Sequence, residues 1–224
     1  MFTPEEVRAA LRLYAVTDRR WLAGRSLFEC VAAALAGGAT CVQLREKGGV
    51  GREGEDEALR IRALCAEAGV PFIVNDDVAL AIALDADGVH VGQGDMGCAH
   101  ARELLGGERI IGVSAHTPAE ALAAAAAGAD YLGVGAVFPT GTKPEAAGIG
   151  VATVQAVCAA VGIPVVAIGG LDIDTIPLLA GSGVAGVAVV SAVFANDDIA
   201  AATGRLAACT KLLLSKPSGK RRLA

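Results

Sequence analysis

Two acidic side chains stand just beyond neighbouring apolar segments, where they could bind a metal ion. Asp76 comes two residues after the apolar run 71–74, and Asp95 comes four residues after the run 88–91. Short apolar runs bounded by glycine or proline are typical of buried strands, so both carboxylates would emerge at strand ends. Two carboxylates, completed by water and phosphate oxygens, form a site that Mg²⁺ accepts. The sequence therefore predicts magnesium bound by Asp76 and Asp95.

A helix cap is the alternative for the first of these acidic segments. Asp76 or Asp77 could begin the helix predicted over 78–84, because aspartate side chains accept hydrogen bonds from the first backbone N–H groups of a helix. We interpret Asp77 as this cap and keep Asp76 as the metal ligand.

Basic, amide and small residues occupy the same position in other segments, at the end of an apolar run. Arg45, Lys47 and Lys143 could bind an anion, since arginine offers a fork of donors and lysine a point charge. Small residues after the last two runs suit a phosphate held by backbone N–H groups. Gln43 and Asn75 offer donor and acceptor atoms to the edge of a heterocycle. The whole set is Gln43, Arg45, Lys47, Asn75, Asp76, Gln93, Asp95, Ser114, Thr140, Thr142, Lys143, Gly169, Gly170 and Ser191. It predicts a metal-bound diphosphate beside a second phosphate, and therefore two substrates.

The elements that carry these residues alternate regularly along the chain. Apolar strands are predicted over 11–16, 40–44, 71–74, 88–91, 109–113, 131–134, 164–168 and 184–190, and helices over 27–36, 57–68, 78–84, 99–105, 118–127, 151–161, 173–180 and 197–214. Strict alternation indicates parallel strands joined by right-handed crossovers. Eight such units predict the α/β class and a single-domain (β/α)8 TIM barrel. The alternative, an open doubly wound sheet, lacks its glycine fingerprint after the first strand, where 17–20 reads Thr-Asp-Arg-Arg.

The composition argues against several other classes of protein. A chain of 224 residues, 54% of them apolar, fits one catalytic barrel domain over 1–214, and it lacks the run of roughly 18 apolar residues that a membrane span needs. The acidic N-terminus is unlike a signal peptide, and six scattered cysteines fit buried thiols in a reducing cytoplasm. A net charge of −5 argues against a nucleic-acid partner, and a homo-oligomer is left open. The remaining segment, 215–224, is basic and predicted to be a disordered tail.

Several short motifs, in this order across residues 13–194, resemble those of the thiamine phosphate synthase family. They are Gln43-Leu44-Arg45-Glu46-Lys47, Val74-Asn75-Asp76-Asp77, His90-Val91-Gly92-Gln93-Gly94-Asp95, Gly112-Val113-Ser114-Ala115-His116, Pro139-Thr140-Gly141-Thr142-Lys143 and Ala167-Ile168-Gly169-Gly170. One such motif alone is weakly specific, whereas all of them together are very specific.

The resemblance implies a transferase that joins 4-amino-2-methyl-5-(diphosphooxymethyl)pyrimidine to a thiazole phosphate, giving thiamine phosphate and pyrophosphate with Mg²⁺ as cofactor. It also implies that pyrophosphate leaves first and that the thiazole nitrogen attacks a pyrimidine methylene cation. The pyrimidine diphosphate would be bound by Gln43, Leu44, Arg45, Glu46, Lys47, Asn75, Ser114 and Lys143, and the thiazole phosphate by Thr140, Gly141, Thr142, Gly170, Val190 and Ser191. Asp76 and Asp95 would hold Mg²⁺, and the catalytic set would be Arg45, Lys47, Ser114 and Lys143.

Two positions depart from the family pattern, and two other functions are alternatives. Gly94 stands where many members carry a polar residue, and Glu145 where an aspartate is usual, so the nearby loops are expected to differ. A thiazole tautomerase of the same fold would be expected to lack the metal pair and to carry histidine near Ala136, so the synthase is favoured. A non-catalytic sensor of phosphate ligands would use the same binding groups as the enzyme.

For several polar residues near these motifs, a structural role is the favoured interpretation. His90 is expected inside its strand, His116 before a helix, and Arg19 and Arg20 at the surface. For Glu46, a structural pairing with a basic neighbour in its motif and a direct role in binding are both open.

The basic tail leads to a testable prediction. Truncation after Leu214 should leave the thermal midpoint and the activity nearly unchanged, because 215–224 contains Pro217, Gly219 and one large apolar side chain, Leu223. Calorimetry and an activity assay of the truncated chain would check this. A large fall in the midpoint would show instead that the tail packs on the barrel or on a partner subunit.

Overall fold

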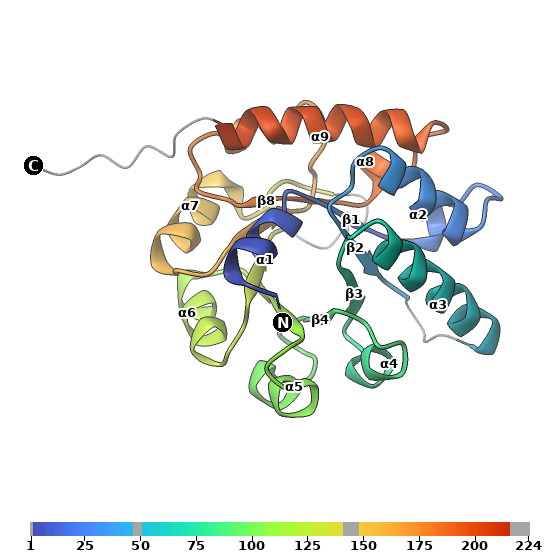
Figure 1. Cartoon of the computed structure of the whole chain (residues 1–224). Helices are drawn as coiled ribbons and strands as arrows, with labels where there is room; N and C mark the ends of the chain where they lie inside the picture. Colours follow the sequence, from blue (N-terminus) through green and yellow to red (C-terminus); the bar gives the residue numbers. More distant parts are fainter. Residues whose placement is uncertain (1, 47–50, 141–147, 216–224) are drawn as a thin grey trace, which may run out of the picture.

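The chain folds into a closed barrel of eight parallel strands, as the alternation predicts (Figure 1). The computed structural model describes residues 2–46, 51–140 and 148–215. The strands are β1 Leu13–Val16, β2 Cys41–Leu44, β3 Phe72–Asn75, β4 Gly88–Val91, β5 Ile110–Ala115, β6 Tyr131–Val134, β7 Val165–Ile168 and β8 Gly186–Val189. Each strand pairs with the next one along the chain, and β8 pairs with β1 to close the circle.

Helices form a ring around the strands (Figure 1). They are α1 Pro4–Ala10, α2 Leu27–Ala36, α3 Arg52–Glu67, α4 Val78–Ala83, α5 Cys98–Leu105, α6 Pro118–Ala126, α7 Gly150–Ala160, α8 Ser191–Phe194 and α9 Ile199–Ser215, with the 3₁₀ helices η1 Arg19–Trp21 and η2 Ile176–Leu179. Most of the predicted helices agree with these bounds to within a residue or two.

Several helical segments differ from the prediction. Helix α3 begins at Arg52 rather than at 57, because glutamate and arginine are good helix formers even without apolar periodicity. Where a helix was predicted over 173–180, the structure has only the short 3₁₀ helix η2. Asp172 Oδ1 accepts hydrogen bonds from the backbone N–H groups of Asp174 (3.0 Å) and Thr175 (2.9 Å), and Pro177 has no N–H to extend a helix. The 3₁₀ helix η1 and the short helix α8 were not predicted.

Side chains alternate between two cores, because successive residues of a strand point to opposite faces. Tyr14 and Tyr131 pack inside the barrel, whereas Leu13 packs in the outer layer between strands and helices. Helix α1 lies across the amino-terminal end of the barrel, where its Val7 and Ala10 join the interior cluster (Figure 1). The carboxyl ends of the strands are left as the open end.

Two capping boxes are present, at Thr3–Glu6 and at Ser26–Glu29. A third, at Thr117–Glu120, is only half formed. Thr117 Oγ1 accepts from the Glu120 N–H (3.2 Å), but Glu120 Oε2 turns to the backbone N–H (2.8 Å) and ring Nδ1 (3.1 Å) of His116. The hydrogen bond from the His116 backbone is the main cause of the lowered pKa of Glu120. His116 therefore precedes α6 as expected and is tied to that helix.

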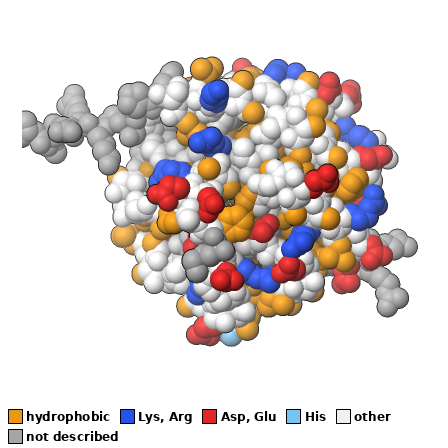
Figure 2. Space-filling model, viewed as in Figure 1, with side chains coloured by type: hydrophobic (Ala, Val, Ile, Leu, Met, Phe, Trp, Pro, Cys, Tyr) orange, Lys and Arg blue, Asp and Glu red, His pale blue; other side chains and the backbone are white. Residues whose placement is uncertain are grey.

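Charges of both signs are mixed on the face shown in Figure 2, with apolar side chains between them. Surface ion pairs link separate elements: Asp85, before β4, contacts Arg62 of α3 (2.6 Å) and Arg109 before β5 (2.9 Å). Within the described ranges, none of the helices combines the length and apolar character needed to cross a membrane.

Thr40 connects helix α1 to the first two strands. Its Oγ1 accepts from the Leu13 N–H (2.8 Å) and donates to the Ala10 carbonyl (2.8 Å), while its own N–H donates to the Leu13 carbonyl (2.8 Å). One threonine thus satisfies the backbone groups at the turn between the end-covering helix and β1.

Replacing Thr40 tests this connection. Thr40→Val keeps the shape but removes the hydroxyl partner of Leu13 and Ala10, and should lower the free energy of unfolding by about 1–3 kcal/mol. The matched control is Thr153→Val, because the Thr153 hydroxyl bonds only the carbonyl of Ile149 one turn earlier (2.7 Å). That control should change stability by less than about 0.5 kcal/mol. Urea unfolding of both variants is the measurement, and equal losses would contradict the assignment.

Candidate functional site

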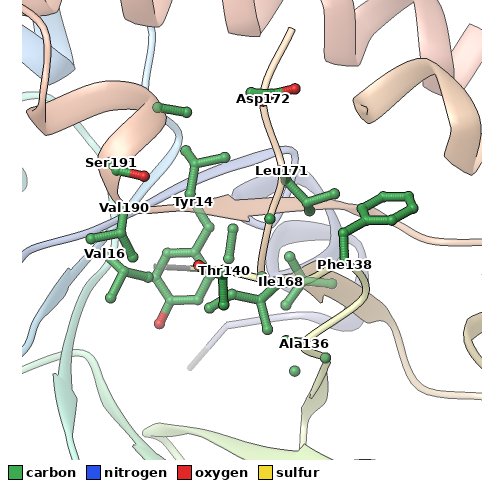
Figure 3. A pocket seen from close by; sticks show the side chains of 18 of the residues that line it. Tyr14, Val16, Ala136, Phe138, Thr140, Ile168, Leu171, Asp172, Val190 and Ser191 are labelled. Carbon is green, nitrogen blue, oxygen red and sulfur yellow. The ribbon is translucent and has the colours of Figure 1, made fainter. Parts of the chain in front are cut away.

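A cavity of about 910 Å³ opens at the carboxyl ends of the strands. Its lining includes the predicted site residues Gln43, Arg45, Asn75, Ser114, Thr140, Gly170, Val190 and Ser191. In Figure 3, Val190 and Ser191 lie on one side, Phe138 and Leu171 on the other, and Tyr14 between them. A space of this size suits small-molecule ligands. The fold therefore gathers residues from distant parts of the sequence around one ligand site.

The cavity wall beyond β7 and β8 offers backbone N–H groups to an anion. Gly169 and Gly170 have φ angles of 94° and 66°, which turn the chain sharply after β7. A Cβ at Gly170 would lie 2.7 Å from the Cβ of Phe138, so a larger residue would not fit. Among the described residues, the N–H groups of Gly170 and Ser191 find no hydrogen-bond acceptor. N–H groups at this position of a barrel, at the start of a short helix, suit a phosphate.

Arg45 reaches the cavity from just after β2 and is held there by Asp18. Its Nη1 lies 3.4 Å from Asp18 Oδ2, and its N–H donates to Thr17 Oγ1 (2.9 Å). Burial alone would raise the pKa of Asp18, but hydrogen bonds from Arg20 and the charges of Arg20 and Arg45 outweigh burial and lower that pKa. Asp18 is thus a charged carboxylate that positions Arg45. Asp18 was not predicted as a site residue, although its place at the end of the first strand was a usable signal.

A chain of hydrogen bonds crosses the barrel at the base of the cavity. Gln43 Nε2 donates to Tyr14 Oη (2.8 Å), and Tyr14 Oη lies 2.9 Å from Tyr131 Oη. His90 Nδ1 lies 3.0 Å from Tyr131 Oη, and its Nε2 lies 3.0 Å from Ser114 Oγ. The predicted place of His90 inside its strand is confirmed, yet its ring also lines the cavity. Neither tyrosine was predicted as a site residue, although they are the only two in the chain.

Asp76 and Asp95 follow the neighbouring strands β3 and β4, outside the residues that line the cavity. Asp76 has a φ angle of 64°, its N–H donates to the His90 carbonyl (2.8 Å), and its Oδ2 accepts from Asn75 Nδ2 (2.6 Å). Asp95 Oδ2 accepts from the Gly92 N–H (2.8 Å). Within the described ranges, His, Cys, Asp and Glu form no group of three or more suited to a metal ion. Mg²⁺ held here would therefore take its other oxygens from water and phosphate, which such a carboxylate pair permits.

The other predicted site residues lie elsewhere. Leu44 follows the inward-facing Gln43, so its side chain points outward and is buried between strands and helices. Its side chain does not face the cavity, and only its backbone could contact a ligand there. Glu46 accepts two hydrogen bonds from Arg19 Nε (2.8 and 2.9 Å), which favours a structural role with a partner that was not predicted. Lys47, Gly141, Thr142, Lys143 and Glu145 lie outside the described residues.

Two further polar residues surround Ser114. Gln93, predicted at a strand end, donates from Nε2 to the Ser114 carbonyl (2.6 Å). His116 lines the cavity two residues later, so its structural role does not keep it away from a ligand.

Comparison with known proteins points to one family. A family model described as thiamine monophosphate synthase matches residues 13–193. The chain is 50% identical over 206 residues to the thiamine-phosphate synthase of Chloroflexus aurantiacus, covering 92% of this chain and 95% of that one. It is 43% identical to the thiamine-phosphate synthase of Clostridioides difficile, over 89% and 95% of the two chains. The solved structure of thiamine phosphate pyrophosphorylase from Pyrococcus furiosus matches with a TM-score of 0.86 at 41% identity, covering 93% and 99%.

The contacts of Asp18 predict a pH-dependent loss of stability. Because its pKa is lowered from 3.8 in the fold, the carboxylate stabilises the fold above the unfolded-state pKa. This stabilisation is lost as the pH falls through the folded-state pKa. Asp18→Asn should therefore lower the free energy of unfolding by about 1–3 kcal/mol at pH 6, and by less near pH 3. Urea unfolding at both pH values would check this, with the exposed Asp174→Asn as control. A loss independent of pH would contradict the charged role.

Proposed function

The chain belongs to the thiamine monophosphate synthase family, and from that premise we propose how its cavity makes thiamine phosphate. The enzyme is a transferase that joins the pyrimidine diphosphate to the thiazole phosphate and releases pyrophosphate. One observation carries the placing of the substrates: a single cavity has Arg45 in one part of its lining and the N–H groups of Gly170 and Ser191 in another. A diphosphate and a monophosphate need two such features.

The pyrimidine diphosphate is assigned to the β2–β5 side of the cavity. Gln43 and Asn75 hydrogen-bond the pyrimidine, while Arg45 and Ser114 bind the diphosphate. Lys47 and Lys143 are assigned to the same diphosphate on the sequence motifs, outside the described residues. The thiazole phosphate is assigned to Thr140, Gly141, Thr142, Gly170, Val190 and Ser191.

Asp76 and Asp95 are the residues that would hold Mg²⁺. The bound ion would supply positive charge to the leaving diphosphate. Their position after two adjacent strands supports this assignment, as does the chemistry of the pair, which leaves room for substrate oxygens.

The reaction needs charge stabilisation more than proton transfer. The bond from the methylene carbon to the diphosphate oxygen breaks, and its electron pair leaves with pyrophosphate. The thiazole nitrogen then donates its lone pair to the methylene carbon. Because that nitrogen carries no proton, no general base is required. Residues that bind the leaving group, such as Arg45, therefore contribute most to lowering the barrier.

The residue at position 136 and a product assay separate the enzyme from the two alternatives, the tautomerase and the sensor. Ala136 lines the cavity where a tautomerase would be expected to carry histidine, and a methyl group cannot transfer a proton. A sensor would bind both ligands without turnover, so a product assay separates it from the enzyme.

A cytoplasmic location belongs to the same proposal. Its support is that all six cysteines are free and four of them are buried, as expected for a protein in a reducing compartment.

Turnover and metal dependence test the proposal. Purified protein should release pyrophosphate only with both substrates and Mg²⁺ present, measured in a coupled assay. Asp76→Ala should lower kcat by at least about 10²-fold, the loss expected for roughly 3 kcal/mol of transition-state stabilisation. A wild-type kcat and an unchanged Mg²⁺ dependence in this variant would contradict the assignment of Asp76 to the metal.

Asp77→Ala is the matched control for that experiment. The Asp77 carboxylate caps α4 by accepting from the Leu80 N–H (2.8 Å), as predicted. Its loss should cost about 1 kcal/mol of stability and leave the Mg²⁺ dependence intact. If the wild-type protein binds both substrates but makes no thiamine phosphate, it is the non-catalytic sensor rather than the enzyme.

A further inference from the structure

We propose that Tyr14, Tyr131 and His90 form a one-directional chain of hydrogen bonds that decides which atoms of Gln43 and Ser114 face the substrate. That this substrate is the pyrimidine diphosphate rests on the proposed function. The direction of the chain rests on the geometry of the barrel and on the orientation of the Gln43 amide.

The chain is continuous, and its Gln43, Tyr14 and Tyr131 members are shielded from water. Its members come from five different strands, β1, β2, β4, β5 and β6, and every link measures between 2.8 and 3.0 Å. Tyr14 and Tyr131 are each 1% exposed, and Gln43 is 5% exposed. Burial raises the pKa of both phenols, so each keeps its hydrogen to donate.

The direction follows from the orientation of the Gln43 amide, which places Nε2 against Tyr14 Oη. Gln43 Nε2 donates to Tyr14 Oη, so the Tyr14 hydrogen must find another acceptor. Within the described part of the chain, Tyr131 Oη is the oxygen placed to accept it. Tyr131 then donates its own hydrogen to His90 Nδ1. In a neutral imidazole the other nitrogen carries the proton, so His90 Nε2–H donates to Ser114 Oγ. The reverse order would need the Gln43 amide turned over, so that Oε1 rather than Nε2 faces Tyr14 Oη and accepts its hydrogen.

This direction sets the chemistry at both ends of the chain. At Gln43 the carbonyl Oε1 is left for a ligand, which suits the exocyclic amine of the pyrimidine as a donor. At Ser114 the oxygen already accepts from His90, so its hydroxyl hydrogen is left to donate, which suits a diphosphate oxygen. The reverse direction would present the wrong partner at each end. His90 and the two tyrosines are therefore positioning residues for the pyrimidine diphosphate.

Two strand glycines make room for the chain. A Cβ at Gly112 of β5 would overlap the ring and Oη of Tyr131. A Cβ at Gly133 of β6 would lie 2.8 Å from Cε1 of His90. Alanine at either place would push a ring out of the chain, so the strands are built to admit these two rings.

Tyr131→Phe breaks the middle link and keeps the ring. The KM for the pyrimidine diphosphate should rise about tenfold or kcat should fall by about as much, while the KM for the thiazole phosphate stays unchanged. The control is Ser182→Ala, which removes a buried hydroxyl that has no partner among the described residues and lies outside the chain. That control should leave all three constants unchanged. If Tyr131→Phe does not fold, Tyr14→Phe breaks the preceding link and tests the same effect.

The tautomer of His90 is a second readout, independent of activity. The chain has three histidines, so ¹⁵N NMR of the imidazoles, assigned with His90→Asn, can resolve this one. The expected state in the free enzyme is protonated Nε2 with bare Nδ1, and Tyr131→Phe should weaken that preference. A protonated Nδ1 with bare Nε2 would overturn the proposal, as would unaltered kinetics in Tyr131→Phe. If the wild type makes no thiamine phosphate, the proposed function fails, and the NMR result still decides the direction of the chain.

Discussion

The alternation of side chains along very short strands controls where each functional group lies. Seven of the eight strands have only four residues, so each sends about two side chains inward. Gln43 faces the cavity and Leu44 the helices, and a slip of one residue would exchange them. The pairing of β8 with β1 prevents such a slip, because a shift in one strand would have to pass around the whole circle. The site therefore depends on the register of the closed barrel.

The inward-facing side chains differ in size between the two ends of the barrel, which is packed at the amino-terminal end and hollow at the carboxyl end. Inward positions near the amino-terminal end carry large side chains such as Ile73, Ile110 and Tyr131, which pack as a core. Near the carboxyl end the inward positions and loops include Gly133, Gly135 and Ala136, which leave space for ligands. Polar atoms at the boundary between these two layers are buried enough to need partners, and the hydrogen-bond chain through Tyr14 and His90 supplies them.

Local patterns could be predicted from the sequence, whereas contacts across the barrel could not. The strand ends that carry Gln43 and Ser114, and the cap at Asp77, follow from periodicity and capping chemistry that neighbouring residues determine. Tyr14 and Tyr131 are 117 residues apart, and no local signal says that two apolar strands bring their hydroxyls together. Glu46 shows the same limit: its nearest basic residues in sequence are in its own motif, yet the fold brings Arg19 to it. The outward direction of Leu44, in contrast, follows from the period of two, because Leu44 is the neighbour of the inward-facing Gln43.

The position of helix α1 has a consequence for how ligands exchange. Within the described part of the chain, its Val7 and Ala10 pack into the interior cluster at the amino-terminal end of the barrel, and the cavity opens at the carboxyl ends of the strands. Solvent and ligands therefore exchange through the carboxyl end. In this way a short helix far from the rim helps confine exchange to the opposite end of the protein.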